Sequence, residues 1–364
     1  MLMRTIIIII HVIVAAMMAA VGAQAQRIQT VDEGGQPIPY ASIFTEAGDF
    51  IGTTGLDGVI SDVKGAEVVS VTHVAYKSKK VKVGQGGRVT LEDADFDLPG
   101  ITVTKKPLVY VQTYYRIIYQ SEDDEMPIYY YRAGVLNNSY DKTTKKTSTD
   151  EEHLTACNIG IFKTMINTVL NTHIKKMANM RMKTVETRMK ETYKDIDISF
   201  VADGPGRQRI TDKFGTVGAV NDNQDKGERR YSYDTHLMSR HKIQATGSDK
   251  RKAKAEKREE RKKNRKDQDF CVYHIDENGN YAPEDFVMSQ LATSYDDEKG
   301  KSHTSIMMQV FTVDRAYVTK AELKQLKKEK KMKMTRQNLQ DLERSHNIPP
   351  LPAELQKRIN EIVK

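Results

Sequence analysis

The run GQPIPYASIFTEAGDFIGTTGLDG, residues 35–58, alternates short β-prone stretches with turn-forming residues. The stretch from Pro39 to Phe44 contains aromatic and β-branched residues, and turn pairs follow it at Gly48-Asp49 and Asp57-Gly58. Glycine supplies the positive φ that tight turns between strands require. We therefore expect closely spaced antiparallel strands in this part of the chain.

The same pattern continues on both sides of this run. Further turn pairs lie at Gly34-Gly35, Lys64-Gly65 and Gly86-Gly87. Further β-rich stretches cover residues 67–71, 79–83 and 88–91. Short strands separated by glycine turns predict an all-β sandwich over residues 26–104, which we expect to fold without the rest of the chain.

Four motifs in this region resemble carboxypeptidase-regulatory-like domains. They are Gly35-Gln36-Pro37-Ile38-Pro39-Tyr40-Ala41, Gly52-Thr53-Thr54-Gly55-Leu56-Asp57-Gly58, Val71-Thr72-His73-Val74-Ala75-Tyr76-Lys77 and Leu98-Pro99-Gly100-Ile101-Thr102-Val103-Thr104. The resemblance covers about 80 residues and implies a transthyretin-like (prealbumin-like) sandwich of seven strands without catalytic function. In that family such modules are frequent at the N-terminus of envelope proteins and outer-membrane receptors of Gram-negative bacteria. The chain departs from the family pattern at Ala75, where glycine is usual, and after Thr54, where an acidic residue is usual.

Residues 105–364 show no family resemblance and mix two periodicities. Strands are predicted at residues 108–120, 128–135, 196–200, 270–275 and 306–313. Apolar residues recur from Phe162 to Ala178 at the spacing of an amphipathic helix. A capping-box spacing from Thr319 to Glu322 starts a basic helix, and a last short helix follows Pro352. This pattern predicts an α+β domain with a helical tail.

Residues 203–268 hold few apolar side chains and end in a charged block. Residues 249–267 contain eleven Lys or Arg against five Asp or Glu, and residues 320–336 contain eight against two. The net charge of the whole chain is +8, so the remainder is slightly negative. This distribution argues against a uniformly basic nucleic-acid-binding protein. We expect a charged, mobile insertion near residues 203–268.

The first 25 residues have the pattern of a secretion signal. Arg4 precedes an apolar run from Ile6 to Ala23, and Ala23-Gln24-Ala25 provides small residues at a cleavage site. The run is also about the ~18–20 residues that an uncleaved anchor needs. The small-x-small ending favours cleavage, which gives a mature chain from Gln26 in the periplasm or outer envelope. No later segment has the composition of a membrane-spanning helix.

Cys157 and Cys271 are the two cysteines of the chain. In an exported protein they are able to form one disulfide. Two buried free thiols are the alternative, and the sequence leaves both open.

Several short patterns invite a catalytic or metal-binding interpretation. His274 and Glu277 have H-x-x-E spacing, with His303 as a third candidate ligand, but a chance match at a strand end is the better interpretation. The other patterns are His236 and His241 with Asp234, the calcium-loop-like start at Asp276-x-Asn278-x-Asn280, and Cys157 near His153. Each lacks a required spacing or residue, so we assign no catalytic, cofactor-binding or metal-binding residue and expect no cofactor.

Two surface features remain as binding candidates. The basic block from Lys250 to Lys266 is able to contact an anionic surface, although a solvated charged helix or coil is the better interpretation. The pair Tyr114-Tyr115 and the triplet from Tyr129 to Tyr131 are able to line a peptide or glycan groove, but half-buried strand positions are the better interpretation.

The sequence therefore favours a non-enzymatic exported envelope protein that binds or scaffolds a peptide, a glycan or another envelope component. A metal-dependent carboxypeptidase or other hydrolase, and an accessory protein of an outer-membrane receptor, are the alternatives.

Overall fold

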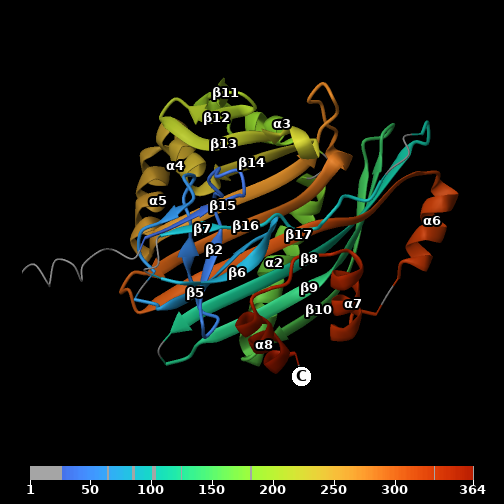
Figure 1. Ribbon diagram of the computed structural model, residues 1–364. Helices are drawn as coiled ribbons and strands as arrows, with labels where there is room; N and C mark the ends of the chain where they lie inside the picture. Colours follow the sequence, from blue (N-terminus) through green and yellow to red (C-terminus); the bar gives the residue numbers. More distant parts are fainter. Residues whose placement is uncertain are drawn as a thin grey trace, which may run out of the picture.

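The computed structural model describes residues 27–63, 65–83, 87–100, 104–123, 125–180, 183–331 and 333–363. This part of the chain is mostly β-sheet, with one large antiparallel sheet and seven α-helices (Figure 1). The secretion signal expected at residues 1–25 lies outside the described residues. So do Lys64 and Gly86 of two predicted turns, and residues 101–103 of the last family-like motif.

The N-terminal module, residues 27–98, holds seven short strands in two sheets with the orders β4-β1-β7 and β3-β2-β5-β6. The strands are β1 (Ile28–Val31), β2 (Ser42–Thr45), β3 (Phe50–Thr53), β4 (Val59–Ile60), β5 (Val68–His73), β6 (Tyr76–Lys82) and β7 (Arg88–Thr90). The Asp57-Gly58 turn needs its glycine: φ is 71° at Gly58, and a Cβ there would lie 2.4 Å from the carbonyl oxygen of Thr30.

Ten antiparallel strands form the large sheet, in the order β10-β9-β8-β17-β16-β15-β14-β13-β12-β11. Two runs of consecutive antiparallel strands supply them, β8 to β10 and β11 to β17, and the first strand of the first run, β8, pairs with the last strand of the chain, β17. The strands are β8 (Leu108–Asp123), β9 (Ile128–Asp141), β10 (Thr147–Cys157), β11 (Ser199–Ala202), β12 (Arg207–Asp212), β13 (Gly215–Asn223), β14 (Glu228–Asp234), β15 (Lys262–His274), β16 (Phe286–Asp297) and β17 (Ser302–Val318).

Each face of the large sheet is covered by a different layer. The helices are α2 (Gly160–Met180), α3 (Val185–Thr192), α4 (Thr235–Thr246), α5 (Asp249–Arg261), α6 (Lys320–Glu329), α7 (Arg336–Ser345) and α8 (Ala353–Ile362). One core joins the N-terminal module, α7 and α8 to side chains such as Tyr114 and Tyr131. A second core joins α2, α3 and α4 to Tyr115 and Tyr130, because successive strand residues point to opposite faces.

Polar contacts also tie the N-terminal module to the sheet. The side chain of Gln120 accepts from the Phe50 amide at 3.1 Å and donates to the Gly48 carbonyl at 2.9 Å. Gln290 donates to the Tyr40 carbonyl at 3.0 Å. All three glutamine bonds satisfy backbone groups that the contact removes from water.

The C-terminal tail closes over the same face. Arg116 is buried within the sheet and donates to the carbonyl of Pro349 at 2.7 Å. From α8, Arg358 donates to the carbonyls of Ala47 and Gly48 and lies 2.8 Å from Asp49. The predicted capping box at Thr319 and Glu322 is confirmed at the start of α6. The tail thus contacts both the sheet and the N-terminal module.

The expectation of a mobile insertion at residues 203–268 is corrected. This segment forms β12, β13, β14, α4, α5 and the start of β15, and β14 and β15 lie inside the sheet. This segment contains few apolar residues because alternate side chains along its strands face the second core and the N-terminal module in turn. Val220, Tyr231 and Tyr233 enter the second core, whereas Asn221, Arg230 and Ser232 face the N-terminal module.

Cys157 and Cys271 are not joined by a disulfide in the structure. They lie on β10 and β15, which are five strand positions apart in the sheet. At about 4.8 Å per strand this separates them by roughly 24 Å, far beyond the ~7 Å that a disulfide bridges.

Candidate functional site

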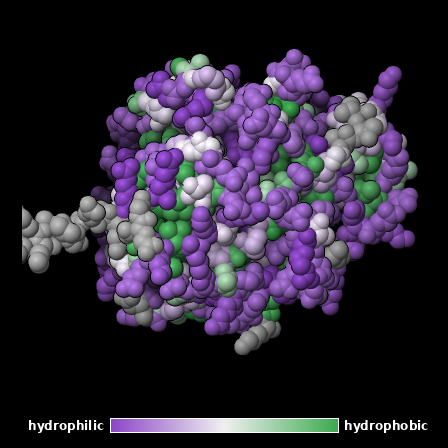
Figure 2. Space-filling model, viewed as in Figure 1, coloured by the Kyte–Doolittle hydropathy of each residue, from purple (hydrophilic) through white to green (hydrophobic). Residues whose placement is uncertain are grey.

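A cleft of about 360 Å³ lies between the N-terminal module and the strands β12 to β15. The module side includes Asp32, Gln36, Pro37, Leu56 and Tyr76. The sheet side includes Arg207, Asn221, Asn223, Gln224, Arg230 and Phe270. This volume is in the range of small-molecule sites. Hydrophilic side chains cover most of the face shown in Figure 2, with smaller apolar patches between them.

Strand register brings the sheet side of the cleft together. Asn221 on β13 lies opposite Arg230 on β14 and opposite Arg207 on β12. Ser232 on β14 lies opposite Phe270 on β15. Residues directly opposite in antiparallel strands share one face, so these side chains line a single polar wall.

Part of the hydrogen-bonding capacity of this wall is free. The side-chain amides of Gln36, Asn221 and Gln224 have no partner among the residues that the structure describes. In contrast, Asp222 pairs with Arg229 at 2.7 and 2.8 Å, and Asp32 accepts from the Gln36 backbone amide at 2.7 Å. The cleft therefore offers neutral amides that both donate and accept, beside two carboxylates, Asp32 and Asp222, that are already engaged.

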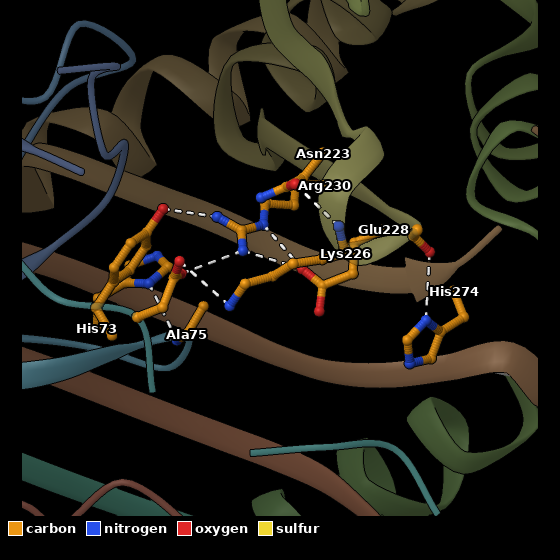
Figure 3. Close-up of polar contacts among 10 residues, drawn as sticks. His73, Ala75, Asn223, Lys226, Glu228, Arg230 and His274 are labelled. Atoms are coloured by element: carbon orange, nitrogen blue, oxygen red, sulfur yellow. Dashed lines mark hydrogen bonds and ion pairs between the residues drawn. The ribbon is translucent and has the colours of Figure 1, made fainter. Parts of the chain in front are cut away.

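Arg230 lines the cleft and contacts three segments of the chain; its polar contacts are drawn in Figure 3. It donates to the Tyr76 hydroxyl at 2.7 Å and lies 3.3 Å from Asp93, both in the N-terminal module. It also lies 2.9 Å from Glu228 on its own strand. Lys226 contacts Asp93 at 3.2 Å and extends the network. The charges hold the module against the sheet at the cleft.

Tyr76 and His73, two side chains of the N-terminal module near Arg230, owe their protonation states to burial. Burial raises the pKa of Tyr76 to about 12, so its hydroxyl stays protonated. Burial, followed by the positive charge of Arg230, lowers the pKa of His73 to about 3. Nδ1 of His73 accepts from the Ala75 amide at 3.2 Å, which leaves the proton on Nε2 (Figure 3). Nε2 is buried and has no partner in the described part of the chain.

The structure separates the candidate zinc ligands. His303 lies opposite Asp296, which lies opposite Lys263, and Lys263 is eleven positions from His274 along β15. At about 3.3 Å per residue, His274 and His303 are roughly 35 Å apart. His274 instead donates to the Gly227 carbonyl at 3.2 Å (Figure 3). Among the described residues, no group of three His, Cys, Asp or Glu is placed to hold a metal ion.

The other short patterns also have structural partners. Asp234 caps α4 by accepting from the Leu237 amide. His236 contacts Glu259 at 3.1 Å, and His241 contacts Asp212 at 2.6 Å, so the two histidines face different carboxylates.

Asp276 accepts from the amides of Asn278 and Asn280 in the β15–β16 connection, which confirms the hairpin interpretation. His153 and Cys157 share strand β10, where four positions span about 13 Å. That distance is too long for a base to activate the thiol.

The tyrosines considered for a groove belong mainly to the cores. Tyr114, Tyr115, Tyr130 and Tyr131 are buried. Their hydroxyls meet protein partners: that of Tyr130 donates to Asn167 at 2.7 Å, for example. These four tyrosines are therefore strand positions and not the lining of a groove. They are buried more completely than the expected half-burial.

Sequence reasoning missed Asn221, Arg230, Tyr76 and Asp93. One signal was present: residues 228–233, Glu-Arg-Arg-Tyr-Ser-Tyr, place aromatic and polar residues at alternating positions. That alternation is typical of a strand with one polar face. The partners of Arg230 in the N-terminal module had no comparable signal.

Comparisons with known proteins add little. No family model matches the chain, and no curated protein matches it significantly. Among solved structures, it has 9% identity to an N-terminal dehydratase from the difficidin assembly line, over 62% of this chain and 82% of that chain, at a TM-score of 0.11. A TM-score at this level carries no argument on fold or function. Among the helices that the structure describes, none combines the length and apolar composition of a membrane crossing.

Proposed function

We propose that this protein is a non-enzymatic, exported envelope protein that binds a short neutral glycan in the cleft between its N-terminal module and its large sheet. The apolar run at residues 6–23 and the small residues before Gln26 support export. The seven short strands and the family-like turns support a transthyretin-like sandwich for the module. The observation that carries the binding function is the set of free amides at Gln36, Asn221 and Gln224.

The chemistry of the cleft favours sugar hydroxyls. Each hydroxyl both donates and accepts, as each amide side chain does. An extended peptide commonly binds by pairing with a free strand edge. The sheet side of this cleft is the face of β13 and β14, and both strands already have neighbours on either side. A glycan needs no free edge, so it fits this wall better than a peptide strand does.

The test is calorimetric titration with neutral tetrasaccharides of chitin, cellulose and maltose, and with tri-alanine as the peptide arm. We expect saturable binding of at least one saccharide and recovery of that saccharide at its original mass. The double variant Asn221→Ala and Gln224→Ala should weaken binding about tenfold, because each lost neutral hydrogen bond contributes about 0.5–1.5 kcal/mol.

Gln325→Ala with Gln337→Ala is the matched control, because both are exposed amides on surface helices outside the cleft. This control should bind like the wild type. Binding of tri-alanine without any saccharide, or shortening of the saccharide, would contradict the proposal.

A further inference from the structure

Helix α5 separates its charges by side. At about 100° per residue, its Lys250, Arg251, Lys254, Lys257, Arg258 and Arg261 fall within an arc of about 120°. The four acidic residues of the helix and one further cation, Lys252, fall outside that arc. We call these six side chains the cationic stripe; it extends about 16 Å along the helix axis.

Every member of the cationic stripe is exposed. None has an ion-pair or side-chain hydrogen-bond partner among the described residues, whereas Glu259 on the other side contacts His236 of α4 at 3.1 Å. That contact directs Glu259 toward α4 and the stripe toward solvent, while Asp249, Glu256 and Glu260 are exposed outside the arc of the stripe. Figure 1 shows α5 at one margin of the molecule, beside α4.

Only Arg258 and Arg261 of the stripe lie in the last turn, where the helix dipole favours cations. The other members of the stripe do not serve the stability of the helix. Lys250 and Arg251 occupy the first turn, where the helix dipole disfavours cations. Lys250, Lys254 and Arg258 are like charges at i, i+4 spacing, which also destabilises a helix. No residue of α5 is buried. The arrangement therefore points to a partner outside the chain.

We propose that the cationic stripe docks the protein on a membrane surface rich in anionic phospholipid. Six exposed cations in a row meet a plane of phosphates, and the absence of large apolar residues from α5 keeps the contact at the headgroups. The rest of the molecule is close to neutral or negative outside residues 320–336, so this contact fixes the orientation of the protein. No aromatic side chain is present in α5 to stack on bases, which favours lipid over single-stranded nucleic acid.

The test is co-sedimentation with vesicles of phosphatidylcholine alone and with 30 mol% (about a third) phosphatidylglycerol, at low and high salt. Residues 26–364 serve in every arm, because both large cores are built from residues 28–359 and the apolar N-terminal run would bind vesicles itself. We expect salt-sensitive binding to the anionic vesicles alone. The triple variant Lys250→Gln, Lys254→Gln, Lys257→Gln should reduce the partition coefficient on the order of 100-fold.

Two control variants show whether a loss of vesicle binding comes from the stripe itself, from the lower net charge or from a folding defect. Lys250→Arg, Lys254→Arg, Lys257→Arg keeps the charge and should bind like the wild type. Lys320→Gln, Lys324→Gln, Lys328→Gln removes the same charge from α6, at the opposite margin in Figure 1, and should also retain binding. Equal loss in the α6 variant, no preference for anionic vesicles, or binding to a duplex oligonucleotide in place of vesicles would each overturn the proposal.

Discussion

Arg230 is the residue on which the contact between the N-terminal module and the sheet most depends. Its side chain is 11% exposed and lies beside Glu228, Asp93 and the Tyr76 hydroxyl. Replacement by Met leaves the largely buried Glu228 without its cation and leaves Asp93 with Lys226 alone. We expect the free energy of unfolding in urea to fall by about 3–5 kcal/mol.

Arg209→Met is the matched control for that change. Arg209 lies on β12, two strands away from β14, and its pair with Asp203 is exposed, so the loss should stay within about 1 kcal/mol. Equal stability of the two variants would mean that the network around Arg230 does not hold the module in place.

His73 makes the stability of the protein depend on pH. Its pKa is about 3 in the folded chain and about 6.5 when unfolded, so the unfolded chain binds more protons between these values. The contribution of neutral His73 to the free energy of unfolding is fully present above pH 6.5 and is lost as the pH falls toward 3. By pH 5 it should have fallen by about 2 kcal/mol.

His73→Asn tests this dependence, because an Asn side chain can still accept from the Ala75 amide. The loss of stability between pH 7 and pH 5 should be about 2 kcal/mol smaller in the variant than in the wild type, as measured by urea unfolding at each pH. An unchanged pH dependence would show that His73 does not titrate on unfolding.

At the scale of elements, α5 and β15 follow one another in the chain but contribute very differently to the free energy of unfolding. No residue of α5 is buried, so replacing Asp249–Arg261 by thirteen Gly and Ser residues should cost less than about 1 kcal/mol. Removing Ser248–Asp267 also deletes the first six residues of β15, which pair with β16. We expect that deletion to cost several kcal/mol more in urea unfolding. Similar stabilities would contradict the place of β15 in the sheet.

Sequence patterns predicted the elements whose own residues carry the signal. The glycine turns of the N-terminal module and the capping box at Thr319 are of this kind. The strands β12 to β14 were missed because half of their side chains face a polar cleft, which lowers their hydrophobicity to that of an insertion. The candidate site was missed for a different reason. Arg230 and Asp93 are 137 positions apart, and only the fold brings them together.

At the scale of the whole molecule, one hydrophobic core crosses the expected domain boundary at residue 104. It joins Ile43 and Leu91 of the N-terminal module to Phe311 of β17 and Leu355 of α8. A core that the N-terminal module shares with the large sheet predicts a single cooperative transition in calorimetry. It also predicts that residues 26–104 alone melt without cooperativity, in contrast to the independent domain that the turn pattern predicts. Two separate transitions in the intact chain would contradict this account.

The most direct test of the central claim is NMR of the labelled protein during titration with a saccharide that binds in calorimetry. The account predicts that the side-chain amide signals of Gln36, Asn221 and Gln224 shift along saturating curves with one common affinity, while those of Gln325 and Gln337 stay unchanged. Shifts confined to residues outside the cleft, with these three amides unaffected, would contradict it.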